Sequence, residues 1–414
     1  MHLLLVTARW PLTSVHEFLH DEIHHLSSAF DRVTVVPLRP TAALAVQLPS
    51  NVVVDTSLAR YLTHFSGRAR PESRSAVAIA RACQANPVGR GFSGDELLTS
   101  DGRKAGWLRA CLIGRADSRS VSLWAKQTRA PDIAYTFWLG AATAGLRAAW
   151  PETPIVSRVH GGDAFSEAHG LKTIPYQREA LRACTLVASV SHTGAAYLSA
   201  KFPEYTGRIV RRTLGIQDLG GVADVAEGPP WKLLSVSSVD TNKRVDLIAR
   251  AAARLAKDGF PVTWTHFGSG PNLGALEALT AQLSPGLAAN LRGQRPPEDV
   301  HLNVMTGGYH AFLNLSLSEG APVSLMEAQC AGLPAVATAV GGTPEVCPPE
   351  LNELVSTHDE VAALAAAIER AVQRSQTQRG RRREHWAQHY DQSVTYRQWA
   401  AELAELASEN SLRR

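Results

Sequence analysis

The chain has 414 residues, of which 45% are hydrophobic and 19% are charged, and this balance excludes a disordered chain and favours globular domains. At about 150 residues per domain, the length predicts two or three domains. The five cysteines are scattered and never form a Cys-x-x-Cys pair, which argues against a disulfide framework or a zinc module and indicates a reducing cytoplasm. No apolar run reaches the roughly 18 residues that a membrane-spanning helix needs.

The net charge of +4 conceals an asymmetry between the two halves of the chain. The first 220 residues carry 25 Lys and Arg against 17 Asp and Glu, and residues 51–130 alone carry 13 against 6. A basic half predicts an anionic partner, which is a phosphate-bearing ligand, a membrane surface or a nucleic acid. An ordinary Arg-rich, solvated surface explains the same counts equally well.

Strand-like and helix-like segments alternate along the chain in two series. The first series has apolar runs at His2–Thr7, Val33–Pro37, Val52–Val54, Ile133–Thr136, Ile155–Ser157 and Leu186–Val190. The second has runs at Lys232–Val236, Val262–Phe267, Ala311–Leu315 and Pro334–Ala337, with helices expected over 243–257, 272–283 and 322–331. This alternation predicts parallel sheets with helices on both faces. The first run has no basic region before it, so we expect a strand rather than a signal peptide.

The stretch 216–230, rich in Gly, Pro and acidic residues, separates the two series and is the expected linker between domains. We therefore expect one domain over 1–217, a second over 218–385 and a long terminal helix over 386–414. In such sheets ligands bind at the carboxyl ends of the strands. Residues 66–130 do not alternate, and are either two packed helices joined by a loop or an insertion that forms an acceptor wall or a membrane-facing surface.

The segment richest in chemistry is 316–345, which reads SLSEGAPVSLMEAQCAGLPAVATAVGGTPE. Glu319 and Glu327 lie eight residues apart across a loop-to-helix junction. Gly320 and Ala321 are small enough to let backbone amides approach a ligand, and a helix N-terminus offers free N–H groups to an anion. Carboxylates at such a junction suit sugar or ribose hydroxyls. The alternative is that Glu319 caps the helix and Glu327 is a solvated surface residue.

This segment resembles the E-x7-E signature of the family-four retaining glycosyltransferases. The resemblance continues through 235–248 (SVSSVDTNKRVDLI), 266–271 (HFGSGP), 157–163 (SRVHGGD), 174–178 (IPYQR), 190–192 (VSH) and 17–23 (EFLHDEI). The last four are similar to the bacterial exopolysaccharide and lipopolysaccharide branch. The resemblance covers most of the chain and is weak over roughly 40–130. It implies an α/β, GT-B fold, in which two doubly wound Rossmann-like domains face each other across a cleft and the terminal helix crosses back to the first domain.

The resemblance also implies a role for individual residues. Glu327 would hold the ribose hydroxyls of the nucleotide and Glu319 the hydroxyls of the donor sugar. Lys243, with Arg244, would neutralise the diphosphate as negative charge develops on the leaving oxygen. His160 would lie beside the donor sugar, near the reacting carbon. The backbone at the donor would come from Gly320, Ala321, Pro322, Val323 and Ser324.

Two departures from the family pattern bear on this assignment. Ser238 stands where many members have an arginine that contacts the diphosphate, so either Arg244 compensates or leaving-group stabilisation is weaker. The first loop, 9–14 (RWPLTS), lacks the Gly-Gly pair of many relatives. Taken without the resemblance, Lys243 and Arg244 can also be explained as surface charge at a helix start, and His160 as a hydrogen-bonded histidine at a strand end. Gly161, Gly162 and Asp163 beside His160 favour the functional interpretation, because paired glycines after a strand permit a tight turn at a ligand.

The sequence HEFLH also matches the H-E-x-x-H pattern of zinc hydrolases. On a helix, His16 and His20 would lie one turn apart as zinc ligands, with Glu17 as the general base. The longer form of the motif fails, because Ile23 and Leu26 stand where a glycine and a third histidine are required. Zinc hydrolysis is therefore a remote alternative.

The resemblance implies a retaining hexosyltransferase that uses a nucleotide-sugar donor, UDP- or GDP-linked, and needs neither a metal nor a cofactor. The absence of any Asp-x-Asp pair is consistent with a metal-free site. The expected acceptor is a lipid-linked or polysaccharide intermediate at the inner membrane face, with peripheral contact to anionic lipid through the basic first half and Trp107–Ile113. Nucleic acid is not an expected partner. A soluble small-molecule acceptor and a non-catalytic sugar-nucleotide binder remain alternatives.

Overall fold

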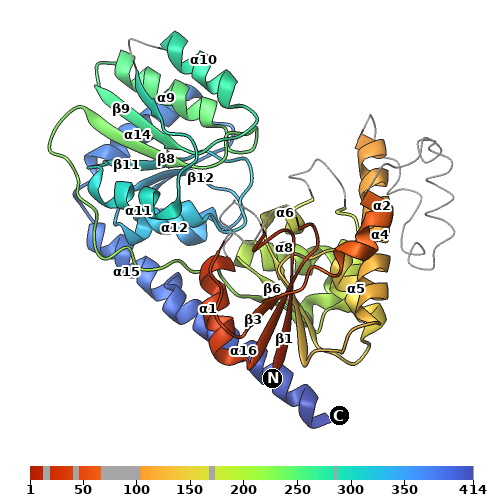
Figure 1. The fold of residues 1–414 in the computed structure, drawn as a ribbon. Helices are drawn as coiled ribbons and strands as arrows, with labels where there is room; N and C mark the ends of the chain where they lie inside the picture. Colours follow the sequence, from red (N-terminus) through yellow and green to blue (C-terminus); the bar gives the residue numbers. More distant parts are fainter. Residues whose placement is uncertain (13–18, 41–45, 67–102, 167–172, 284–286, 414) are drawn as a thin grey trace. The chain divides into compact units, whose positions relative to one another are not determined.

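The computed structural model of the chain describes residues 1–12, 19–40, 46–66, 103–166, 173–283 and 287–413 (Figure 1). The chain forms two compact units, one of Met1–Arg212 with Tyr396–Arg414 and the other of Thr213–Thr395. Each unit is a parallel β-sheet with helices packed against it. The expectation of two doubly wound α/β domains is confirmed.

The sheet of the first unit has the strand order β3-β2-β1-β4-β5-β6-β7. Its strands are β1 (His2–Thr7), β2 (Arg32–Pro37), β3 (Val52–Val54), β4 (Ile133–Thr136), β5 (Ile155–Val159), β6 (Leu186–Ser189) and β7 (Ile209–Arg211). The helices are α1 (Leu19–Ala29), α2 (Ala59–Ser66), α4 (Arg103–Ala125), α5 (Ala141–Ala149), α6 (Gly161–Ala164), α7 (Gln177–Ala183) and α8 (His192–Lys201), followed by the 3-10 helix η5 (Pro203–Arg208). Helices on both faces bury the strands, which explains their continuous apolar runs.

The sheet of the second unit has the strand order β10-β9-β8-β11-β12-β13. Its strands are β8 (Trp231–Val236), β9 (Val262–Phe267), β10 (Ala288–Leu291), β11 (Ala311–Asn314), β12 (Ala335–Thr338) and β13 (Glu353–Val355). Its helices are α9 (Val245–Lys257), α10 (Leu273–Leu283), α11 (Pro297–Thr306), α12 (Val323–Cys330), α13 (Thr343–Val346), α14 (Val361–Gln373) and α15 (Arg379–His389). The chain order reverses between β8 and β11, and the carboxyl ends of strands at such a switch point form the usual ligand crevice.

The C-terminal segment consists of two helices, α15 and α16 (Gln392–Arg413), where the sequence predicted one helix over 386–414. The helix is interrupted at 390–391. Here the Ile216 N–H donates to the Tyr390 carbonyl, and the Ile216 carbonyl accepts the N–H of Gln392. This bridge ties residue 216 to the second unit. The units divide after Arg212 and after Thr395, five residues before the expected boundary at 217 and ten residues after that at 385.

A charged pair is fully buried where α16 packs on the first unit. Glu22 of α1 and Arg158 of β5 lie 3.1 Å apart, and neither side chain is exposed to solvent. The Tyr135 hydroxyl lies 3.0 Å from the Glu22 carboxylate and accepts a 2.7 Å hydrogen bond from Nε of Arg158. The Arg158 guanidinium also lies 5.2 Å from the ring centre of Trp399 in α16. The pair therefore joins α1, the sheet and the C-terminal helix.

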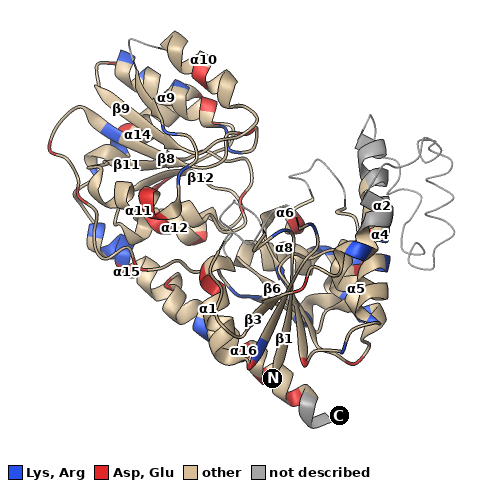
Figure 2. Ribbon diagram, in the orientation of Figure 1, with Lys and Arg blue, Asp and Glu red and all other residues tan. Residues whose placement is uncertain are grey.

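A run of basic residues marks α15 (Figure 2). Its sequence, RGRRR, has the composition of an anion-binding patch. However, Arg382 is buried and donates to the carbonyls of Leu351 and Thr377, at 2.8 and 2.7 Å. Arg383 makes two 2.6 Å hydrogen bonds to Asp218. Much of the run therefore stabilises the second unit itself.

Within the described ranges, no helix combines the length and the apolarity needed to cross a bilayer. Residues 67–102 lie outside those ranges, and so do the side chains of Arg103–Arg109. The expectation of a membrane-facing surface at Trp107–Ile113 therefore falls largely outside the described residues.

Candidate functional site

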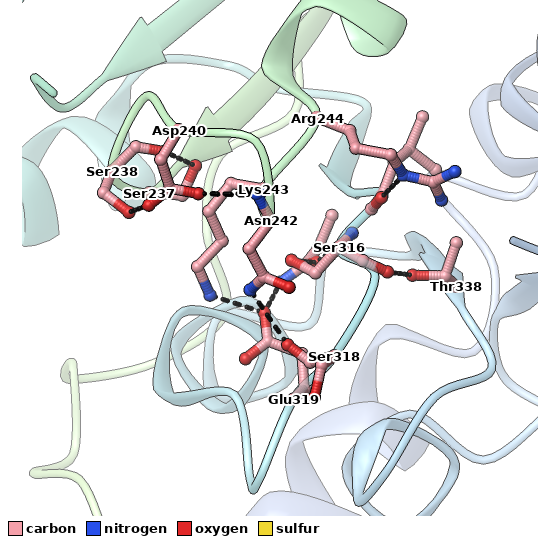
Figure 3. A network of polar contacts seen from close by, with 12 residues as sticks. Ser237, Ser238, Asp240, Asn242, Lys243, Arg244, Ser316, Ser318, Glu319 and Thr338 are labelled. Carbon is pink, nitrogen blue, oxygen red and sulfur yellow. Dashed lines mark hydrogen bonds and ion pairs between the residues drawn. The ribbon is translucent and has the colours of Figure 1, made fainter. Parts of the chain in front are cut away.

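The loop between β8 and α9 presents Lys243 at the carboxyl edge of the second sheet. Asp240 organises this loop, because its Oδ1 accepts the N–H groups of Asn242 and Lys243 at 2.9 and 3.0 Å. Its Oδ2 accepts the Ser238 hydroxyl at 2.6 Å, and Ser238 is exposed. The turn therefore fixes the backbone of Lys243 immediately before the helix, as Figure 3 shows.

Lys243 and Glu319 form an ion pair, with Nζ of Lys243 2.6 Å from Oε1 of Glu319 (Figure 3). The lysine side chain is 23% exposed and the glutamate side chain 9%. Asn242 holds the two loops together, since its carbonyl accepts the Leu317 N–H at 2.8 Å and its amide donates to the Ser318 carbonyl at 3.1 Å. The structure thus brings together two expected site residues that lie far apart in the sequence.

Arg244 is directed away from this pair (Figure 3). Its backbone is left-handed, with φ of 48°, at the N-cap of α9. Its guanidinium donates to the carbonyls of Leu315 and Thr357, at 2.6 and 2.8 Å, and burial lowers its pKa. In this arrangement Arg244 braces the loops after β11 and β13. Whether Arg244 compensates for Ser238 at the diphosphate stays a prediction.

The start of α12 holds the other expected donor-binding positions. The Gly320 carbonyl accepts the N–H of Gly342, at 3.1 Å, so the loop after β12 supports the junction. Pro322 is the N-cap of α12, and this junction is followed by the partly exposed first turn of the helix. The positions that form the junction and this first turn are Gly320, Ala321, Pro322, Val323 and Ser324.

Glu327 lies in α12, one turn beyond this junction. Its Oε1 is 2.9 Å from Nε2 of His301 on α11, and its side chain is 14% exposed. Sequence reasoning did not single out His301. It belongs to no motif, and only the fold brings α11 against α12 at this point.

His160 follows β5 in the first unit, whereas the other expected site residues all belong to the second. Its Nε2 lies 3.1 Å from the Phe137 carbonyl, and its N–H donates to Asp163 at 2.5 Å. The other oxygen of Asp163 accepts the Leu139 N–H at 2.7 Å, so the carboxylate joins the loops after β4 and β5. Burial, helped by the nearby Arg158 cation, lowers the pKa of His160 to about 3, which keeps the imidazole neutral.

An exposed aromatic residue, Trp138, stands beside His160. The two ring centres are 4.4 Å apart, and Trp138 is 39% exposed although it is large and apolar. No sequence signal distinguishes Trp138, because a tryptophan two residues after a strand is as readily a core residue.

The HEFLH pattern falls mainly outside the described residues, which include His20 but neither His16 nor Glu17. In the part of the chain that the structure describes, no three His, Cys, Asp or Glu side chains gather in a way that could hold a metal ion.

Residues 230–374, all within the second unit, match the model of the family described as glycosyl transferases group 1. The chain is 31% identical over 140 residues to one component of the human phosphatidylinositol N-acetylglucosaminyltransferase, covering 34% of this chain and 28% of that protein. It is 28% identical over 149 residues to the putative colanic acid biosynthesis glycosyltransferase WcaL of Salmonella typhimurium, covering 34% of this chain and 36% of WcaL. The matched part thus spans about a third of the length of these relatives.

Solved structures match over nearly the whole chain. The apo form of the lipopolysaccharide outer core galactosyltransferase WaaB aligns with a TM-score of 0.67 at 16% identity, covering 99% of this chain and 100% of WaaB. Sucrose-phosphate synthase from Thermosynechococcus elongatus aligns with a TM-score of 0.69 at 14% identity, covering 99% and 100%. Anabaena HepE, in complex with UDP, aligns with a TM-score of 0.62 at 15% identity, covering 98% and 100%. The chain therefore has the GT-B fold that these proteins share.

Proposed function

We propose that the chain is a retaining glycosyltransferase that moves a hexose-type sugar from a nucleoside-diphosphate sugar to an acceptor hydroxyl. The observation that carries the proposal is the Lys243–Glu319 pair at the carboxyl ends of β8 and β11. It supplies a cation for a departing diphosphate and a carboxylate for sugar hydroxyls at one place. The group 1 match over 230–374 supports the same assignment.

The proposed transfer takes place on the front face of the donor sugar. The acceptor oxygen bonds to the anomeric carbon on the side from which the diphosphate leaves, as the bond from that carbon to the phosphate oxygen breaks. The acceptor proton passes to the departing phosphate oxygen, so no side chain needs to act as the base. Lys243 stabilises the charge on the leaving group and Glu319 orients the sugar. His160, as a neutral imidazole, would add a hydrogen bond near the reacting carbon.

UDP is the first nucleotide to test and GDP the second. HepE and the pneumococcal GtfA, which share this fold, were both solved with UDP bound. We propose that the chain needs no cofactor or metal, since Lys243 supplies the positive charge. Addition of EDTA is therefore expected to leave the rate of transfer unchanged, and a loss of activity that Mg²⁺ or Mn²⁺ restores would overturn this part of the proposal.

A thermal-shift panel tests the donor site directly. UDP, GDP, ADP, dTDP and CDP, alone and sugar-linked, are added to the wild-type chain and to Glu327→Ala. A ligand at a hundredfold excess over its Kd stabilises the fold by about 2.7 kcal/mol. We expect one base to stand out and its effect to shrink in the variant. A flat panel with folded protein would contradict the donor site.

The proposed acceptor is a lipid-linked or polysaccharide intermediate, reached from the cytoplasm at the inner membrane face. The names of the relatives point to this class, since they include a subunit of phosphatidylinositol N-acetylglucosaminyltransferase and glycosyltransferases of colanic acid and amylovoran biosynthesis. The basic balance of the first 220 residues supports contact with anionic lipid.

Cosedimentation with vesicles tests the membrane contact. The chain is expected to sediment with phosphatidylglycerol vesicles at low salt and to be released at high salt, because charge attraction is screened within about 10 Å at 0.1 M salt. It is not expected to sediment with phosphatidylcholine vesicles. Equal sedimentation with both lipids would contradict an electrostatic contact. No sedimentation with either would favour a soluble acceptor.

A further inference from the structure

The imidazole of His301 is the side chain that the structure places against Glu327. The two belong to different helices, α11 and α12, and their hydrogen bond of 2.9 Å joins Nε2 of His301 to Oε1 of Glu327. Both side chains are largely buried, at 18% and 14% exposure, so water competes little for this bond. The acidic first turn of α11, red in Figure 2, is Glu298 and Asp299, one turn before His301.

A second polar contact lies at the other ring nitrogen of His301. Nε2 of the Gln217 amide lies 3.4 Å from Nδ1 of His301. A carboxylate oxygen only accepts, so Nε2 of His301 donates the hydrogen bond to Glu327. Gln217, His301 and Glu327 thus lie in one row of polar contacts. All three residues belong to the second unit.

The hydrogen bond from His301 restricts how Glu327 can present its carboxylate. An unrestrained carboxylate turns about its last torsion, which is broad. The bond from His301 holds Oε1, so the second oxygen keeps one direction. A carboxylate held in this way suits two neighbouring donors at a fixed spacing, such as the 2′- and 3′-hydroxyls of a ribose, and suits a 2′-deoxyribose less well because one donor is missing.

We propose that His301 is a positioning residue, which holds Glu327 so that the site selects ribonucleoside diphosphates over their 2′-deoxy counterparts. The inference rests on the proposed function, which places the nucleotide at Glu327. It adds the selection against 2′-deoxyribose and the residue that produces it. A hydrogen bond to a charged group contributes enough that its loss changes affinity by about tenfold or more.

The test measures Kd by titration calorimetry on the full chain, with UDP and 2′-deoxy-UDP as the paired probes. Wild type is expected to bind UDP about tenfold more tightly than 2′-deoxy-UDP. In His301→Ala the ratio should fall towards one, mainly because UDP binds more weakly. In His301→Gln the ratio should be largely kept, because the amide can still donate to Glu327. Leu302→Ala, at a neighbouring position that is 64% exposed, is the matched control and should behave as wild type.

The outcomes separate this inference from the proposed function. If wild type binds UDP without preferring it to 2′-deoxy-UDP, or if His301→Ala keeps the preference while Glu327→Ala loses it, the role of His301 is overturned and the donor site stands. GDP and 2′-deoxy-GDP are the second pair of probes. If wild type binds none of the nucleotides of the thermal-shift panel, the proposed function itself fails. Circular dichroism checks that each variant is folded. If His301→Ala does not fold, the comparison of His301→Gln with wild type still tests the proposal.

Discussion

Lys243→Ala is expected to lower the rate of sugar transfer by about 10²–10³-fold, the effect of removing a group that stabilises developing charge. Lys243 is held by the Asp240 turn and lies 2.6 Å from Glu319 at the carboxyl edge of the sheet. Without the ammonium group, the departing diphosphate loses its cation and meets an unpaired Glu319 carboxylate. The substitution should therefore weaken nucleotide binding as well as slow transfer.

We would measure kcat and KM of this variant from the release of nucleoside diphosphate. The donor is the one that the thermal-shift panel identifies. Lys257→Ala is the matched control, because Lys257 is an exposed lysine at the other end of the same helix, α9. A double variant, Lys243→Ala with Glu319→Gln, separates the loss of the cation from the added repulsion, since the nucleotide should bind this variant better than the single variant. Equal rates for Lys243→Ala and wild type would remove Lys243 from the mechanism.

The fold and the core of this site were predictable from the sequence because their signals are local. A strand that is buried on both faces reads as an apolar run, and the carboxyl ends of parallel strands meet at one edge. The motifs that follow β8 and β11 therefore had to come close, and Lys243 and Glu319 do. The short outer strands β7, β10 and β13 escaped prediction, because edge strands such as Ala288–Leu291 are only partly buried and carry no apolar run.

The partners of the expected residues were not predictable, because they depend on which elements pack together. His301 is an unremarkable position on α11 until the fold sets it against Glu327. Arg244 is predicted as a second diphosphate ligand beside Lys243, and the structure adds that its guanidinium donates to the carbonyls of Leu315 and Thr357. The resemblance predicts a role for each residue from its position in a motif. It does not predict the direction of the side chain, which depends on the backbone conformation and on the neighbouring residues.

Glu22→Ala is expected to destabilise the first unit by about 3–5 kcal/mol, the cost of leaving a buried charge without its partner. Arg158 is fully buried, and its guanidinium lies among Tyr135, Tyr396 and Trp399. Burial raises the pKa of Glu22, and the Arg158 cation opposes that shift, so the ionised carboxylate depends on its partner.

Urea denaturation of wild type, Glu22→Ala and the double variant Glu22→Met with Arg158→Met measures this effect. The double variant should lie much closer to wild type than the single variant, because an apolar pair of similar volume avoids the cost of desolvating two charges. Since Tyr396 and Trp399 belong to α16, the single variant should also expose that helix to proteolysis before the rest of the chain. A single variant as stable as wild type would show that the pair does not hold α16 in place. The register of α16 would then depend on the apolar contacts of Trp399, Leu403 and Ala407 with the core.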